Sequence, residues 1–153
     1  MQNVTDQDRA ILRSLQQDAE LTAQEIAEAT NIAPATAWRR IERMEAAGVI
    51  EAREVVIDPR ALGLEVEVSL RVTLDKTEMN AFDQFIDAAR GILEINEIQT
   101  FLGRVDVRLN VLARDMAHYQ EIYRNQILSL PHIQDIEALM LVSTIYNKEQ
   151  LPL

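Results

Sequence analysis

The chain has 153 residues and a mass of 17.4 kDa, which suits one ordinary domain or two small ones with a real core. The hydrophobic content of 48% and the charged content of 26% are ordinary for a globular protein and exclude disordered and low-complexity chains. The absence of cysteine excludes disulfides, thiolate nucleophiles and the common structural zinc sites. The net charge of −10 and the sequence pI near 4.6 argue against nucleic acid as a partner, unless positive charge is concentrated locally to neutralise phosphates.

The first third of the sequence predicts three short helices, because apolar residues recur at helical spacing from Thr5 to Gly48. Two helix starts have the spacing of a capping box, in which a hydroxyl residue and an acid three positions later satisfy free backbone amides. These pairs are Thr5 with Asp8 and Thr22 with Glu25. We therefore expect helices to begin after both threonines and the third helix to end at Gly48.

Only residues 30–33 separate the second and third predicted helices. Asn31 is the residue in this segment best able to adopt a left-handed turn, and Pro34 suits the first position of a new helix. The pattern predicts a tight helix-turn-helix. In that motif the second helix lies in the major groove of DNA, with its first residues on base edges and later basic residues on phosphates.

After Gly48 the hydrophobic period changes to two, so residues 49–57 predict a strand or a short wing that closes at Asp58-Pro59. Residues 58–64 are the expected hinge. Beyond it the pattern predicts a strand, a helix, two strands, a helix and a last strand over residues 133–144, with the second of these helices starting at Asp115.

This order is typical of the split βαβ or ferredoxin-like fold. The sequence therefore predicts an α+β protein, with a winged helix-turn-helix domain at residues 1–57, a hinge at 58–64 and a ferredoxin-like domain at 65–153.

The longest apolar run is Ala138-Leu139-Met140-Leu141-Val142, far shorter than the ~20 residues that span a bilayer, and the start MQNVTDQDRA lacks the pattern of a secretion signal. We expect a soluble, cytoplasmic protein. Because this run is apolar on both faces of a strand, we expect a second subunit to cover one face at Leu139, Met140 and Leu141. The alternative is a central strand covered by the chain's own carboxy-terminal tail.

The predicted second helix of the helix-turn-helix is positively charged, so it could bind DNA although the whole chain has a net charge of −10. Residues 33–43 contain three arginines and one glutamate, a local charge of +2. The candidate DNA-binding residues are Pro34, Ala35, Thr36, Arg39, Arg40 and Arg43. The alternative is a solvated arginine face paired with Glu42 or Glu45. Arg40 ranks below the other arginines because it can reach Glu45 or the first helix, and Trp38 is expected in the core.

Several short motifs in this order resemble the leucine-responsive and asparagine-responsive regulator family (Lrp/AsnC) over nearly the whole chain. They are Asp8-x-x-Ile11-Leu12, Leu21-Thr22-x-x-Glu25-Ile26-Ala27, Pro34 to Arg40-Ile41-x-x-Met44-Glu45-x-x-Gly48-Val49-Ile50, Asp58-Pro59-x-x-Leu62-Gly63, Gly103-x-x-Asp106 and Leu130-Pro131-x-Ile133. The resemblance implies a transcriptional regulator that binds double-stranded DNA, with a ferredoxin-like domain of the RAM type. It also implies a homodimer able to assemble further, for example into octamers.

In this family the loop between the two middle strands lines a cleft between dimers that binds a small effector, usually an amino acid. The resemblance places the effector-binding residues at Thr100, Leu102, Gly103, Arg104, Val105, Asp106 and Leu128. Asp106 would hold an ammonium group, Arg104 a carboxylate, and Gly103 would leave room for the ligand. The alternative is a tight hairpin with a turn glycine and two surface charges.

The sequence departs from the family pattern at Asn31, Ala33 and Leu102, where the family usually has glycine, serine, and serine or threonine. The first two changes should weaken the start of the DNA-contacting helix modestly. The third leaves the identity of the effector open, and the apolar character of Leu102 and Leu128 favours a hydrophobic or aromatic ligand side chain.

We expect no enzymatic activity, no cofactor and no metal site, because His118 and His132 stand isolated from any nucleophile or ligand pair in the sequence. Two alternatives remain. Some tetrapyrrole (sirohaem-type) decarboxylases share this two-part architecture, but basic and histidine side chains would then be expected in the cleft segments. A metabolite-binding module without DNA binding would suit the net charge, but it would not explain the three arginines at positions 39, 40 and 43 of the predicted helix.

Overall fold

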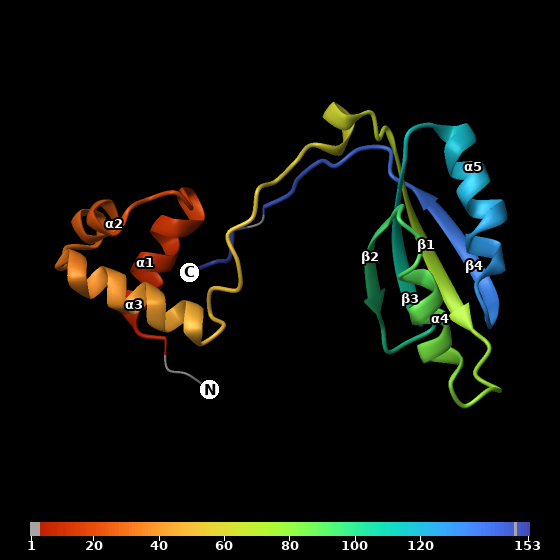
Figure 1. Ribbon diagram of the computed structural model, residues 1–153, viewed down its shortest axis with the longest axis horizontal. Helices are drawn as coiled ribbons and strands as arrows, with labels where there is room; N and C mark the ends of the chain where they lie inside the picture. Colours follow the sequence, from red (N-terminus) through yellow and green to blue (C-terminus); the bar gives the residue numbers. More distant parts are fainter. Residues whose placement is uncertain (1–3, 149) are drawn as a thin grey trace. The chain divides into compact units, whose positions relative to one another are not determined.

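The computed structural model describes residues 4–148 and 150–153, and the chain divides into two compact units (Figure 1). The first unit comprises Met1–Val56 with Tyr146–Leu153, and the second comprises Ile57–Ile145. The start of the predicted first domain, residues 1–3, lies outside the described residues.

The first unit contains the three predicted helices, α1 (Asp6–Gln17), α2 (Ala23–Thr30) and α3 (Pro34–Ala46). Both predicted capping boxes are confirmed: Thr5 caps α1 with Asp8, and Thr22 caps α2 with Glu25. The helices pack around a small apolar core formed by Ile11, Ile26, Ala27, Ala37, Ile41 and Met44.

The turn between α2 and α3 has the predicted geometry. Asn31 is left-handed, with φ 54° and ψ 48°, and Pro34 occupies the first turn of α3. Gly48, with φ 68°, follows the end of α3 as expected. Ala33 supplies no side-chain hydrogen bond to the start of α3, in line with its departure from the family pattern.

The sequence predicts a strand or a short wing at residues 49–57, and the structure has no strand there. Residues 51–58 have no regular structure, and Val55, Val56 and Ile57 are 87%, 78% and 61% exposed. A strand needs a hydrogen-bonded neighbour, and the alternating pattern of one segment does not supply one. The wing of this unit is therefore an irregular segment.

The last residues of the chain, Tyr146–Leu153, group with the first compact unit, whereas the sequence prediction places residues 65–153 in the second domain. The backbone amide of Leu151 donates to the side-chain carbonyl of Gln16 in α1, and the Gln150 side chain donates to the Gln16 carbonyl at 3.0 Å. Which surface a polar tail contacts depends on such distant partners.

The second unit has the predicted ferredoxin-like order (Figure 1). Its elements are η1 (Pro59–Leu62), β1 (Val66–Leu74), α4 (Ala81–Ala89), β2 (Ile95–Thr100), β3 (Val107–Ala113), α5 (Met116–Asn125), η2 (Ile127–Ser129) and β4 (Ile133–Met140). The strands form one antiparallel sheet in the order β2-β3-β1-β4. As expected, α5 starts after Asp115, whose carboxylate accepts a hydrogen bond from the His118 amide.

Strand alternation separates the two faces of this sheet. On one face the apolar residues of β1, Val68, Leu70, Val72 and Leu74, form the core with residues of both helices. The other face, here called the open face, carries the remaining residues of each strand and receives neither α4 nor α5. The whole core of the unit therefore lies on one side of the sheet.

The last strand is shorter than predicted, because β4 ends at Met140 rather than at Thr144. It is an edge strand, so the alternative of a central strand covered by the chain's own tail is wrong. Register places Leu139 opposite Ser69 on the open face and Met140 opposite Val68 on the helix side. Leu139, Met140 and Leu141 are 36%, 49% and 39% exposed.

Candidate DNA-binding helix and effector loop

Helix α3 buries Ala37, Ile41 and Met44 and turns the opposite side outward. Of the predicted DNA-binding residues, Pro34 and Ala35 are exposed at the start of the helix and Thr36 is half-buried. Arg39 is exposed and has no ion-pair partner among residues 4–148 and 150–153. The outward side of α3 thus carries the guanidinium of Arg39, unpaired among the described residues, one turn beyond the exposed residues Pro34 and Ala35.

Arg40 and Arg43 are held by one buried acid, Asp8 of α1. The carboxylate of Asp8 is fully buried and lies 2.8 Å from Arg40 Nη1 and 2.7 Å from Arg43 Nη2. The same carboxylate accepts hydrogen bonds from the Thr5 amide at 2.9 Å and the Thr5 hydroxyl at 2.7 Å. The expectation that Arg40 reaches the first helix is confirmed, whereas the contact of Arg43 was not predicted.

These contacts lower the pKa of Asp8 from its ordinary value of 3.8 to about 2. Burial of the carboxylate alone would raise the pKa, but hydrogen bonds from Thr5 and Arg40 and the charge of Arg43 outweigh it. Asp8 therefore stays ionised throughout the physiological pH range.

The depressed pKa predicts acid sensitivity of the first unit. The resulting stabilisation, about 2 kcal/mol, should be fully present above the unfolded-state pKa near 3.8 and lost as the pH falls toward about 2, because the unfolded state binds the proton more tightly. Urea unfolding followed by the fluorescence of Trp38, the only tryptophan, reports on this unit. Asp8→Asn should remove this part of the pH dependence, and an unchanged dependence would contradict the assignment.

Trp38 does not fill the core, contrary to the prediction, and is 56% exposed. Successive helix residues are rotated by about 100°, so the residue after buried Ala37 turns toward the edge of the helix. The core is already filled by Ile11, Ile26 and Met44. The indole therefore stands at the surface of α3.

The predicted effector residues are only partly gathered in one place. Thr100 ends β2, and residues 101–106 form the loop to β3, in which Leu102, Gly103 and Arg104 are exposed. Leu128 lies on a separate element, η2, and is 52% exposed. Thr100 and the loop residues are contiguous in the chain, whereas Leu128 is assigned to the effector site only by the family resemblance.

Asp106, predicted to hold the ammonium group of an effector, is buried and already has partners within the second unit. Its side chain is 8% exposed, accepts a hydrogen bond from the Leu74 amide at 2.9 Å and lies 2.6 Å from Lys76 Nζ. Burial would raise the pKa of Asp106, but the contacts with Lys76 and Leu74 lower it. Asp106 thus ties the loop to the end of β1, and no sequence motif marked Lys76 as its partner.

A cavity beside Thr100 was also missed by sequence reasoning. It has a volume of about 290 Å³ and is lined by Ile98 and Thr100 of β2 and by five residues of α4 and its end: Phe82, Asp83, Ile86, Asp87 and Arg90. It combines apolar walls with charges of both signs. The only available signal was the charged side of the predicted helix at 82–89.

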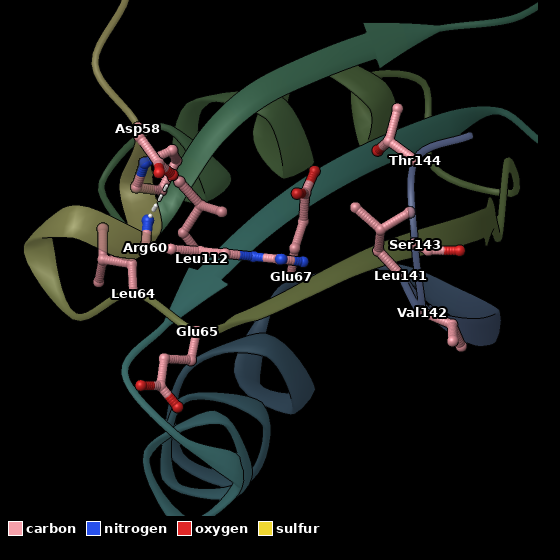
Figure 2. Close-up of a pocket in the computed structure, with 11 residues that line it drawn as sticks. Asp58, Arg60, Leu64, Glu65, Glu67, Leu112, Leu141, Val142, Ser143 and Thr144 are labelled. Carbon is pink, nitrogen blue, oxygen red and sulfur yellow. Dashed lines mark hydrogen bonds between the residues drawn. The ribbon is translucent and has the colours of Figure 1, made fainter. Parts of the chain in front are cut away.

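A second cavity, of about 390 Å³, lies where the predicted hinge meets the sheet (Figure 2). Asp58 accepts a hydrogen bond from the Arg60 amide at 2.9 Å, and the Arg60 side chain extends across the cavity toward Glu67 in Figure 2. Leu112 and Leu141 also line it, so this cavity continues the open face of the sheet.

The open face is polar at its centre and apolar at its β4 edge. Arg108 lies 2.8 Å from Glu97, and the Asn110 side chain donates to Asn96 at 2.9 Å. Arg108 Nε is buried without a hydrogen-bond partner in the part of the chain that the structure describes. Leu139 and Leu141 border this polar centre.

With this geometry established, comparison with known proteins identifies the class. Residues 5–51 match the family model for a winged helix-turn-helix DNA-binding domain, and residues 67–151 match that for the Lrp/AsnC ligand binding domain. The chain therefore belongs to the Lrp/AsnC family of DNA-binding transcriptional regulators.

Individual relatives agree over almost the full length. The DNA-binding transcriptional activator DecR of Escherichia coli is 26% identical over 146 residues, covering 95% of this chain and 96% of that protein. The glutamate uptake regulatory protein of Zymomonas mobilis is 28% identical over 153 residues, covering 100% and 93%. An AsnC family regulator from Agrobacterium tumefaciens has a TM-score of 0.86 at 28% identity, covering 97% and 96%.

A transcriptional regulator from Neisseria meningitidis, solved in complex with L-methionine, has a TM-score of 0.90 at 24% identity and covers 98% of this chain and 97% of its own. These comparisons favour a regulator over the tetrapyrrole decarboxylase. In the described part of the chain no helix is long and apolar enough to cross a membrane.

Proposed function

We propose that this regulator reads operator DNA through α3 and changes its activity when a small effector, an amino acid, binds the second unit. The observation that carries the proposal is the outward side of α3, where Arg39 stands exposed and unpaired among the described residues of a protein with net charge −10. Pro34, Ala35 and Thr36 would face base edges, and the arginines would contact phosphates.

For the effector we propose the loop at residues 101–106 together with Thr100 and Leu128. An amino acid needs partners for an ammonium and a carboxylate and a surface for its side chain. The loop amides and Arg104 supply donors, and the cavity beside Thr100 supplies Asp83, Arg90 and apolar walls. The methionine complex of the Neisseria relative agrees with a ligand of this class.

We propose that the open face of the sheet docks against a second copy, with Leu139 and Leu141 inside the contact and Met140 at its border. The support is the exposure of these side chains on an edge strand and the absence of a helix of the same unit on that face. Further assembly of dimers, for example into octamers, would follow from the family resemblance.

We propose no catalytic step, cofactor or metal for this protein, and a cytoplasmic location where the DNA is accessible. Both histidines already make local contacts: His118 lies 3.6 Å from Glu94, and His132 lies 2.7 Å from the Gln84 side chain. Residues 58–64 would act as the hinge between the DNA-binding and effector-binding parts, as the sequence predicts.

The test of the proposed function combines two measurements on the full chain. Selection from a random pool of duplexes should enrich a defined DNA sequence, and a thermal-shift screen against the twenty amino acids should find at least one that raises the melting temperature. If a duplex is enriched but no amino acid raises the melting temperature, DNA binding is supported and the proposed amino-acid effector is contradicted. No enriched duplex would contradict the role of α3.

The Asp106 contacts lead to a prediction about effector binding. Asp106→Ala should weaken binding of the stabilising amino acid more than tenfold, because the loop loses its anchor to Leu74 and Lys76. DNA binding without the effector should survive, since the arginines belong to the other unit.

Calorimetric titration of Asp106→Ala and Lys76→Met separates anchoring from direct binding. If Asp106 anchors the loop, Lys76→Met should also weaken the ligand. Tighter binding in Lys76→Met would show instead that the lysine competes with the ligand ammonium for Asp106. Wild-type affinity in Asp106→Ala would mean that the loop is only a hairpin.

A further inference from the structure

The three arginines of α3 differ in their ion-pair partners. Arg39 has no ion-pair partner in the described part of the chain, while Arg40 and Arg43 each bind a different oxygen of Asp8. The side chain of Arg40 is 29% exposed and that of Arg43 is 51% exposed. Arg43 is thus fixed at Nη2 while half of its surface remains open to solvent.

A guanidinium is planar and presents five donors in a rigid fork, so fixing one terminal nitrogen orients the others. The carboxylate that fixes Arg43 is itself held by two hydrogen bonds from Thr5 and is completely buried. Arg40 occupies the other oxygen and donates to the Thr5 hydroxyl at 3.2 Å. Asp8 therefore cannot rotate without breaking contacts to both helices.

We propose that Asp8 is a positioning residue for DNA recognition: it presents Arg43 in one fixed orientation, with Arg40 locked beside it, and so sets the register of α3 on the operator. The inference rests on the DNA-binding role proposed for α3. Asp8 itself touches no DNA in this scheme and acts through the arginines.

The proposal separates charge from orientation. Affinity for DNA of arbitrary sequence depends on the number of positive charges near phosphates. Affinity for the operator depends in addition on phosphate contacts that hold the protein in one register, so that other residues meet the correct bases. Removing the negative charge of Asp8 while keeping both arginines should therefore lower the affinity for the operator relative to the affinity for DNA of arbitrary sequence, without weakening the latter.

The variant Asp8→Asn tests this with the full chain. Two duplexes are compared over a series of salt concentrations: one that the wild type enriches from a random pool, and a scrambled duplex of the same composition. Asp8→Asn should bind the scrambled duplex at least as tightly as the wild type, with a steeper salt dependence. It should lose about tenfold in the ratio of selected to scrambled affinity, the scale of one well-placed contact. An unchanged ratio would overturn the proposal.

Glu25→Gln is the matched control, because Glu25 caps α2 as Asp8 caps α1. It accepts hydrogen bonds from the Thr22 amide at 2.8 Å and the Thr22 hydroxyl at 2.7 Å, but it has no arginine partner in the described chain. Glu25→Gln removes one negative charge and the side-chain part of a capping box, as Asp8→Asn does. Its ratio of selected to scrambled affinity should stay at the wild-type value. An equal fall in this control would assign the effect to helix capping and overturn the proposal.

Arg43→Lys covers the case in which Asp8→Asn does not fold, since it leaves Asp8 and the capping box intact. Lysine keeps the charge but not the planar fork, so the affinity ratio should fall severalfold while the salt slope on the scrambled duplex stays unchanged. A wild-type ratio in Arg43→Lys would overturn the inference alone. A wild-type protein that enriches no duplex would overturn the proposed DNA binding and the inference with it.

Discussion

Replacing Arg39 with alanine should weaken operator binding by about tenfold and reduce the slope of its salt dependence by about one. Arg39 is exposed on the outward side of α3 and has no ion-pair partner among the described residues, so its full charge is available to a phosphate. Fluorescence anisotropy with a labelled duplex over a salt series measures both quantities.

Arg43→Ala should reduce the slope less than Arg39→Ala, because Asp8 already neutralises part of the Arg43 charge. Arg124→Ala, which removes an exposed arginine from α5 in the other unit, is the control and should leave affinity and slope unchanged. Equal slopes for wild type and Arg39→Ala would show that α3 does not face phosphates at this position.

Placing a charge at Leu139 should dissociate the proposed dimer. Leu139 lies on the open face of the edge strand β4, opposite Ser69, and is 36% exposed in the single chain. A buried, unpaired carboxylate in Leu139→Asp would cost about 3 kcal/mol or more, which weakens association at least about a hundredfold. Sedimentation at micromolar concentration should show a dimer or larger for the wild type and a monomer for the variant.

Met140→Asp is the informative neighbour, because Met140 lies opposite Val68 on the helix side of the same strand and is 49% exposed. This variant should keep most of the assembly. Dissociation by Met140→Asp but not by Leu139→Asp would place the partner on the helix side, and a monomeric wild type would contradict the proposed contact altogether. Circular dichroism checks that each variant retains its fold.

Features decided by neighbours in sequence were predicted well. The capping pairs Thr5 with Asp8 and Thr22 with Glu25 are present, and Asn31 has the left-handed conformation expected of it. Each of these depends on residues within three or four positions, whose geometry the helix itself fixes. The order of strands and helices followed from hydrophobic periods for the same reason.

Features that need a distant partner were predicted poorly. The strand alternative at residues 49–57 is not realised, because no strand in the described part of the chain pairs with this segment, and β4 ends at Met140 although its apolar pattern continues. Trp38 was expected inside, but the space is taken by residues of other helices. In each case the sequence pattern describes what a segment prefers and not what lies next to it.

The sequence by itself determined the two-part architecture, the helix-turn-helix and the arginine side of α3, because helical and strand periods are local properties of the chain. Only the tertiary structure decided which charges are free. Asp8 meets Arg40 and Arg43 across more than thirty positions, and Asp106 meets Lys76 across about as many, through the packing of separate elements. Such pairings depend on the folded distance between side chains, which the spacing of residues along the chain does not encode.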